Sequence, residues 1–296
     1  MIYFRGVGNT RICTSDASTT TYTACTWVIT GSNVSMAGNI DNLLDYTVVA
    51  NRESPSMANY AFSYLFKSCT ALVSAPQFPQ RTLSEYCYRG MFYGCTSLVS
   101  APALPSGSVA VSCYDSMFFG CSNLQVPPAV LPATTLVSGC YRGMFENCTS
   151  LLTTPVISAS VLVGNSCCQM FGACTSLTDN IDMRHVTAVG ASTIEGSGTM
   201  AVSCNIAVLF DTSLVSLAEN AFAGVFSNSQ TFRTYYYFTD NDTVSFTAAN
   251  VVSGGGSKSP YTHYIYTDNT TIKDAALAKV EQYTTVNVYH LDGSDW

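Results

Sequence analysis

The sequence predicts an α/β repeat solenoid built from units of 26 or 27 residues, each with a short helix and a short parallel strand. Two observations indicate this fold. A phenylalanine, a cysteine and a leucine recur together, in the same order, along the middle of the chain. One unit is too short to bury its own apolar side chains, whereas stacked units bury them in a continuous core. We expect a β-rich cap before the repeats and an α/β cap after them.

Five units share one phase. Their phenylalanines are Phe66, Phe92, Phe118, Phe145 and Phe171, their cysteines are Cys69, Cys95, Cys121, Cys148 and Cys174, and their leucines are Leu72, Leu98, Leu124, Leu151 and Leu177. The steps between units are 26, 26, 27 and 26 residues. A second cysteine opens the later four units, where the first unit has Ala61. Weaker copies of the pattern flank these units, and we assign residues 59–226 to the repeats.

Each unit contains a helical pattern and an extended one. In the stretch CYRGMFYGC, the residues Cys87, Met91 and Cys95 are four apart, which is typical of an apolar helical stripe. Gly94 is suited to end this helix. The following stretch SLVSAP favours a short strand, which Pro102 ends. Strands of successive units are expected to stack in parallel, about 4.8 Å apart.

Composition and charge exclude several classes of protein. Charged residues make up 10% of the chain and hydrophobic residues 47%, and the net charge is −7. An acidic chain that is poor in lysine offers no basic surface to nucleic acid or to anionic lipids. No apolar stretch is long enough to span a membrane, and residues 1–16 do not resemble a signal peptide. We therefore expect no nucleic-acid partner and no membrane insertion.

The thirteen cysteines raise the question of disulfides, metal binding or burial. Cys87 and Cys95 would lie roughly 12 Å apart on a helix, which is too far for a disulfide. Equivalent cysteines of neighbouring units come closer, but their side chains would point the same way. No group of cysteines and histidines has the spacing of a zinc site. Since Ala61 fills the cysteine position of the first unit, we favour buried thiols selected by size, which suit an intracellular or anaerobic setting.

No catalytic, cofactor-binding or metal-ligating residue is predicted, and no cofactor is expected. The three histidines, His185, His263 and His290, lack the neighbours found in catalytic and zinc-binding motifs. We expect structural roles for them. Asp240 and Asp242 offer oxygen ligands for calcium but lack the rest of a calcium-binding loop, so a turn is the favoured interpretation.

Rows of residues that vary between units predict the exposed surface. The residue after the phenylalanine changes in size and charge, as does the row of Arg89, Asp115 and Arg142, so both rows are expected to face solvent. The pair after each leucine lies on the expected strand ladder and is almost uncharged, which suits a glycan or an apolar protein face. An aromatic cluster lies near residue 235. The candidate binding residues are Val73, Ser74, Val99, Ser100, Gln125, Leu152, Thr153, Tyr93, Phe119, Tyr235 and Tyr237.

The unit resembles a known class of repeat. Its aromatic-x-x-Cys-Thr-Ser-Leu pattern, as in MFYGCTSLVSAPALP at 91–105, is similar to that of BspA-like leucine-rich repeats, although the proline comes earlier and alanine replaces the usual isoleucine. IYFRGVGNT, WVITGSN and GNIDNLLDY resemble the N-terminal caps of this family, which indicates a cap over residues 1–58. TTVNVYHLDGSDW resembles its closing segments, so we assign residues 227–296 to a C-terminal cap or appendage. Within it, residues 271–283 have the pattern of an amphipathic helix that caps the end or, as the alternative, docks a partner.

The resemblance implies recognition without catalysis. Members of the family are surface adhesins of gut and oral bacteria and components of phage virions and tail fibres. The favoured expectation is a non-enzymatic adhesion protein at a cell surface that binds a host protein or glycan. One alternative is a structural component of a phage virion or tail fibre, which would form a stable homo-oligomer such as a trimer. An intracellular scaffold is the other alternative.

Overall fold

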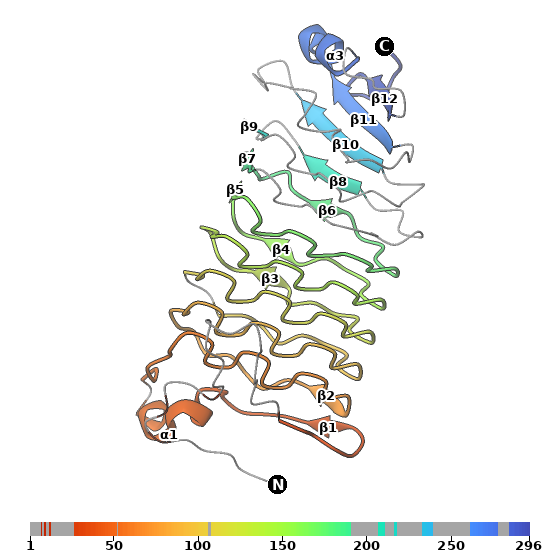
Figure 1. The fold of residues 1–296 in the computed structure, drawn as a ribbon. Helices are drawn as coiled ribbons and strands as arrows, with labels where there is room; N and C mark the ends of the chain where they lie inside the picture. The colour runs from red at the N-terminus through yellow and green to blue at the C-terminus, as the bar shows by residue number, and fades with distance from the viewer. Residues whose placement is uncertain are drawn as a thin grey trace.

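The computed structural model describes most of the chain up to residue 190 and parts of the C-terminal third. The described residues are 7, 9, 12, 27–51, 53–105, 108–190, 207–210, 216–217, 233–238, 261–277 and 284–296. For the strands at 207–210, 216–217 and 233–238, only the backbone is described. Within these limits, successive coils of the chain lie side by side between the N-terminal and the C-terminal end (Figure 1).

The described strands are short, and all of their pairings are parallel. β1 (Val34–Ser35) pairs with β2 (Leu72–Ser74), β3 (Val130–Leu131) with β4 (Val156–Ile157), and β7 (Ala188–Val189) with both β5 (Val161–Leu162) and β9 (Ser216–Leu217). Neighbouring parallel strands must be joined by a crossover of at least a dozen residues. Here one coil of chain makes that connection, so Val130 pairs with Val156, one repeat further on.

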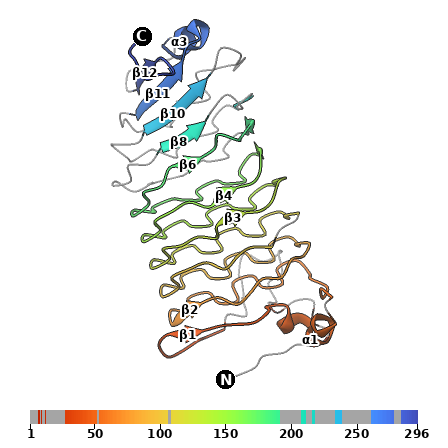
Figure 2. The same ribbon diagram turned by 180° about the vertical axis from the view of Figure 1, so that it is seen from behind.

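A five-stranded parallel sheet forms the C-terminal end of the stack (Figure 2). Its order is β12 (Thr284–Tyr289), β11 (Tyr261–Thr267), β10 (Arg233–Phe238), β8 (Ala207–Phe210) and β6 (Ile181–Asp182). Because β10 pairs with β8, the sheet continues across the boundary that the sequence places after residue 226. Helix α3 (Thr270–Leu277) covers the first part of the helix predicted at 271–283 and packs against β11 and β12.

The β-rich cap expected over residues 1–58 is not found in the described part of that region. It contains one two-residue strand, β1, and one helix, α1 (Asn42–Ala50). Leu43 and Leu44 are buried in the first turn of this helix, which is interrupted at Asp45, where φ is −150° and ψ is 103°. Just before the helix, Asp41 forms a buried ion pair with Arg81 of the first repeat. Burial raises the pKa of Asp41 by more than the Arg81 guanidinium lowers it. The ion pair links the start of α1 to the first repeat.

The helix predicted in each unit is wrong, because the structure has a run of turns there. Within each unit, every fourth residue of this run has a backbone φ in the left-handed region. A right-handed helix requires negative φ at every residue, so these residues cannot belong to one. In the second unit these residues are Tyr86, Gly90 and Gly94, with φ of 56°, 56° and 70°. The same three positions have positive φ in the other units: Tyr60, Tyr64 and Ser68, then Ser112, Ser116 and Gly120, then Gly139, Gly143 and Asn147, then Asn165, Gln169 and Ala173.

The backbone hydrogen bonds explain why this run of turns is stable. Alternate N–H groups close a turn, as from Cys95 to the Phe92 carbonyl at 3.0 Å. The N–H groups between them bond to the next unit, as from Phe92 to the Met117 carbonyl at 2.9 Å. The ladder between units therefore satisfies backbone groups that a helix would satisfy internally. We call residues 60–69, 86–95, 112–121, 139–148 and 165–174 the turn segments.

The core consists of equivalent side chains from successive units. Phe92, Phe118 and Phe145 stack with ring centroids 5.5 and 5.7 Å apart and nearly parallel planes. Tyr88 and Tyr114 form a second stack at 5.8 Å, and the leucines that follow the cysteines are buried. From this packing in register, we infer that the units form a solenoid with turn segments in place of the predicted helices.

Candidate functional site

The row of residues that follows each leucine forms a backbone ladder between units. Gln125 N–H donates to the Val99 carbonyl at 2.9 Å, and Leu152 N–H donates to the Gln125 carbonyl at 3.2 Å. Thr178 N–H then donates to the Leu152 carbonyl at 3.2 Å. The comparison of units therefore identified residues that lie side by side in space. The strand expected here is complete only in the first unit, as β2, whereas a single bridge joins Ser100 to Val126.

The predicted residues of this row differ in exposure. Val73 and Ser74 lie in β2 and are half-buried. The others are exposed: Val99, Ser100, Gln125, Leu152 and Thr153. The part of the row that is open to a partner therefore begins at the second unit.

Several exposed aliphatic side chains of the same repeats were missed by the sequence analysis. Val126, Val130, Val156 and Val161 have exposed fractions of 53%, 42%, 61% and 45%. In β3, β4 and β5 the exposed valine is followed by a buried residue, and that alternation was the available signal. We call the following exposed residues the strand face: Val99, Val126, Val130, Leu152, Val156 and Val161.

The sequence around the strand face carries no charge. No Asp, Glu, Lys or Arg occurs in residues 90–114, 116–141 or 147–178. The charged residues that separate these stretches, Asp115, Arg142 and Glu146, all belong to turn segments. A partner that covers the strand face therefore does not need to remove water from a charged group of these stretches, which keeps the cost of desolvation low.

The aromatic residues Tyr93 and Phe119 lie in turn segments and are half-buried. Their rings stack with centroids 4.5 Å apart, and the Lys67 ammonium lies 5.4 Å from the centroid of Tyr93. A sugar that stacks on an aromatic side chain needs an open ring face, and each of these rings covers one face of the other. Tyr235 and Tyr237 lie in β10, and their side chains are outside the described part of the structure.

The sequence predicts that the row of Arg89, Asp115 and Arg142 faces solvent, but the structure shows this only for part of the row. Asp115 is buried and forms an ion pair with Arg89, with 3.2 Å between the carboxylate oxygen and Nε. Stacking brings these opposite charges together from neighbouring units. Arg142, in the next unit, is exposed.

Ten cysteines lie in the described residues, and all ten are buried and form no disulfide. All of them except Cys168 form two rows with different surroundings. In the row at the end of the turn segments, the thiols of the second to fifth units donate to the carbonyl of the phenylalanine in the preceding unit, as from Cys121 to Phe92 and from Cys148 to Phe118, both at 3.1 Å. Cys69 of the first unit donates instead to the Trp27 carbonyl at 2.8 Å. The Phe92 carbonyl also accepts the Cys95 N–H, so both of its lone pairs are used.

In the second row, at the start of the turn segments, the backbone group beside the thiol belongs to the same unit, as Ser84 for Cys87 and Val137 for Cys140. Its contact between units is long, with 4.0 Å from the Cys140 sulfur to the Ser166 carbonyl oxygen. Burial raises the pKa of Cys140 to about 11 and that of Cys87 to about 12, so these thiols stay protonated and unreactive at neutral pH. Size explains the second row, as Ala61 suggested, whereas the first row also needs a hydrogen-bond donor.

This difference predicts opposite responses to serine. Cys121→Ser keeps a donor beside the Phe92 carbonyl and is expected to change the free energy of unfolding by less than about 1 kcal/mol. Cys113→Ser buries a more polar hydroxyl beside the backbone of Ala110 in its own unit, without the contact to the preceding unit that Cys121 makes, and is expected to cost about 1–3 kcal/mol. Urea denaturation in the presence of a reductant measures both values. Equal losses for the two variants would show that the thiol hydrogen bond has no role.

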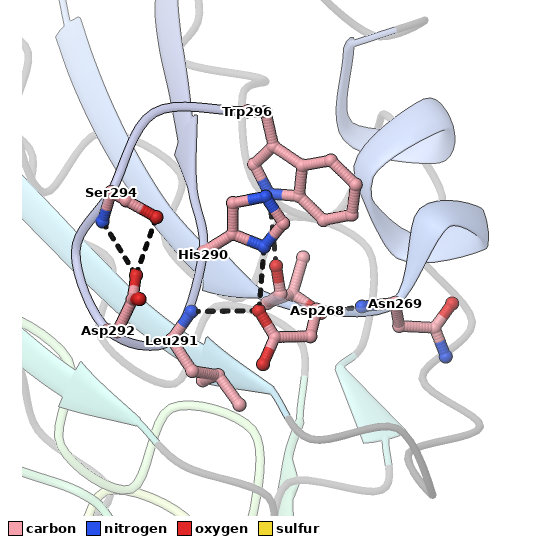
Figure 3. A network of polar contacts seen from close by, with 8 residues as sticks. Asp268, Asn269, His290, Leu291, Asp292, Ser294 and Trp296 are labelled. Atoms are coloured by element: carbon pink, nitrogen blue, oxygen red, sulfur yellow. Dashed lines mark hydrogen bonds and ion pairs between the residues drawn. The ribbon is translucent and has the colours of Figure 1, made fainter.

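The C-terminal residues form a polar cluster against β11 and α3. His290 Nδ1 lies 2.9 Å from an Asp268 oxygen, and the imidazole stacks on Trp296 with centroids 4.1 Å apart (Figure 3). The Trp296 indole N–H donates to the Thr267 carbonyl at 3.0 Å. The Lys273 ammonium lies 4.4 Å from the centroid of the same indole. These contacts tie the end of the chain to β11 and α3.

A catalytic role does not follow from this cluster. The Ser294 hydroxyl donates to Asp292 at 2.6 Å, which lowers the pKa of that carboxyl, and so it is directed to Asp292 (Figure 3). His290 therefore contacts an acid and an aromatic ring, as expected of a structural histidine. Among the described residues, no group of three or more His, Cys, Asp or Glu side chains is placed to hold a metal ion.

Comparison with known proteins identifies no relative. No family model matches the chain, and no curated protein and no solved structure matches it either. In the described part of the chain, no helix has the length and apolar character needed to cross a membrane. The function must therefore be inferred from the repeats and from the surfaces that they expose.

Proposed function

We propose that this chain is a non-enzymatic recognition protein of the BspA-like leucine-rich-repeat type, which binds a partner through the strand face. The observation that supports this proposal most directly is the row of exposed aliphatic side chains in uncharged stretches of sequence. Val126 and Val156 are more than half exposed, and no charged residue lies within nine positions of either. Exposed apolar side chains that recur from unit to unit are typical of protein interaction sites.

A protein partner fits this face better than a glycan. The strand face consists of valine and leucine side chains, which have no aromatic ring for a sugar to stack on. Ser100, Gln125 and Thr153 are exposed in the same row and supply polar contacts of the kind found around the apolar centre of a protein interface. An apolar patch on a host surface protein matches the strand face in chemistry, and the backbone ladder along Val99, Gln125 and Leu152 holds neighbouring units at fixed spacing.

The same face supports a second candidate, a structural component of a phage virion or fibre. An uncharged aliphatic face is able to pack against another copy of itself, because no like charges oppose the contact. This candidate predicts a stable homo-oligomer, such as a trimer, at micromolar concentration. Light scattering separates the two candidates, since an adhesin is expected to be a monomer or a weak oligomer.

The double variant Val126→Lys/Leu152→Lys tests the role of the strand face. Two buried ammonium groups in an interface are expected to weaken binding at least 100-fold. Binding is measured on purified epithelial surface proteins that the wild-type protein captures, with direct titration of each. The variant Thr134→Lys/Thr135→Lys adds the same charge in an exposed bend and is expected to bind like the wild type.

Three results would contradict the proposal. One is the absence of any partner in protein capture and on a glycan array. Another is full binding by the strand-face variant. The third is equal loss of binding by both variants, which would point to net charge rather than to this face. Circular dichroism of all variants ensures that only folded proteins are compared.

A further inference from the structure

The turn segments contain a polar pocket that is separate from the strand face. It is lined by Ser112, Ser138, Gly139, Arg142, Asn165 and Gln169, with Cys168 at its wall, and its volume is about 360 Å³. Pockets that bind small molecules have volumes of roughly 300–1,000 Å³. Three successive units contribute residues to this pocket, so the stacking of the repeats creates it.

The pocket exists because one row of side chains becomes small. The first positions with positive φ in the five turn segments are Tyr60, Tyr86, Ser112, Gly139 and Asn165. In the first two units this row is filled by two tyrosine rings stacked 4.6 Å apart. At the fourth position a Cβ on Gly139 would lie 2.7 Å from the Ser112 hydroxyl oxygen, so even a methyl group would intrude. Glycine therefore keeps the space above Ser112 open.

The donors that line the pocket match a carboxylate. The Arg142 side chain is exposed and forms no hydrogen bond or close ion pair within the described residues, whereas Arg89, in the same row, is paired with Asp115. The carboxylate that interacts electrostatically with Arg142 is Glu146, outside the pocket lining, whose pKa is raised by burial and lowered by the Arg142 guanidinium. Asn165 adds an exposed side-chain amide, and no carboxylate lines the pocket. The Arg142 guanidinium is thus available to bind a carboxylate through two parallel hydrogen bonds.

The remaining lining groups indicate what carries that carboxylate. Hydroxyls of Ser112 and Ser138 and the Asn165 amide can donate to and accept from the hydroxyl groups of a sugar. The single arginine and the net charge of −7 oppose an extended polyanion, which would need several cations in a row. We propose that this pocket binds an acidic sugar residue, with its carboxylate on Arg142 and its hydroxyls on the serine and amide groups.

The proposal is tested with the full chain and free monosaccharides. Glucuronic acid and N-acetylneuraminic acid are titrated and followed by NMR, with glucose and acetate as neutral and sugar-free probes. Both acids are expected to bind with a Kd in the millimolar range, at least tenfold tighter than glucose or acetate. Arg142→Gln is expected to reduce their affinity at least tenfold. Arg184→Gln removes the same charge from an exposed arginine outside the pocket and is expected to have no effect.

Other results would overturn the proposal. If acetate bound as tightly as the two acidic sugars, the pocket would be a site for any small anion. If glucose bound as tightly as they do, Arg142 would not contribute to binding. No binding of either acid up to about 20 mM, or an unchanged affinity in a folded Arg142→Gln variant, would also reject it. None of these outcomes depends on the strand face, so this test is independent of the proposed protein partner.

Discussion

Raising the pH from 9 to 10.5 is expected to unfold this protein cooperatively. The reason is the set of buried thiols. Burial raises the pKa of Cys87, Cys121 and Cys167 from 9.0 to about 12 and that of Cys140 to about 11. Above pH 9 the unfolded chain loses these protons and the folded chain keeps them, so stability is constant below pH 9 and falls as the pH rises through the window up to about 11 or 12.

The expected loss is comparable to the whole stability of a typical domain. Each thiol of this kind costs about 1.4 kcal/mol at pH 10, and four of them cost on the order of 6 kcal/mol. Typical domains are stable by only about 5–15 kcal/mol. The buried Tyr88, Tyr114 and Tyr141, whose pKa values are also raised by burial, extend the loss above pH 10.

Urea denaturation at a series of pH values, with a reductant present, measures this loss. The matched variant is Cys87→Ala/Cys140→Ala, which changes two thiols of the row where the first unit already has alanine. Its stability is expected to fall about 3 kcal/mol less than that of the wild type between pH 7 and pH 10. If the wild type were equally stable at both pH values, the thiols would not be buried as the structure shows.

The sequence was sufficient to predict which residues are equivalent between units. Spacing alone placed Val99, Gln125 and Leu152 on one row, and the structure links them by hydrogen bonds. It also indicated buried thiols, because Ala61 replaces cysteine in one unit. These predictions succeed because stacking places every residue beside its counterpart one repeat later, whatever the local conformation.

The local conformation itself was predicted wrongly for a physical reason. Cys87, Met91 and Cys95 lie on one side of the chain in a helix, but they also do so when every fourth residue has positive φ. The distinguishing signal was present in Gly90 and Gly94, which tolerate positive φ and stand four apart at those positions.

The polar pocket could not be predicted from spacing. It depends on which row loses its large side chains, and this requires knowing that Tyr86 and Gly139 occupy equivalent places in the stack. Whether the Arg142 side chain is available also depends on which charged side chains lie near it in the folded chain. Arg89 and Arg142 belong to the same row, but only Arg89 is paired with a neighbouring carboxylate in the described structure.

Phe118→Ala is expected to be the most damaging single substitution in the repeats. Phe118 is fully buried and lies between Phe92 and Phe145, with ring centroids 5.5 and 5.7 Å away and planes within 2° of parallel. Truncation of a buried phenylalanine costs about 3–5 kcal/mol through lost burial and the cavity that remains. Two aromatic stacks are lost in addition, each worth about 0.5–1.5 kcal/mol.

The neighbouring residue supplies the control. Phe119 is half-buried and stacks on Tyr93 alone, so Phe119→Ala is expected to cost less than about 2 kcal/mol. Urea denaturation followed by circular dichroism compares the two variants.

The Phe118→Ala variant is also expected to unfold in two transitions instead of one. Each unit contacts mainly its neighbours, so loss of the Phe118 ring separates the two halves of the stack. A single transition, with equal losses of stability for both variants, would mean that the phenylalanine stack does not stabilise the repeats more than the pair of Tyr93 and Phe119 does.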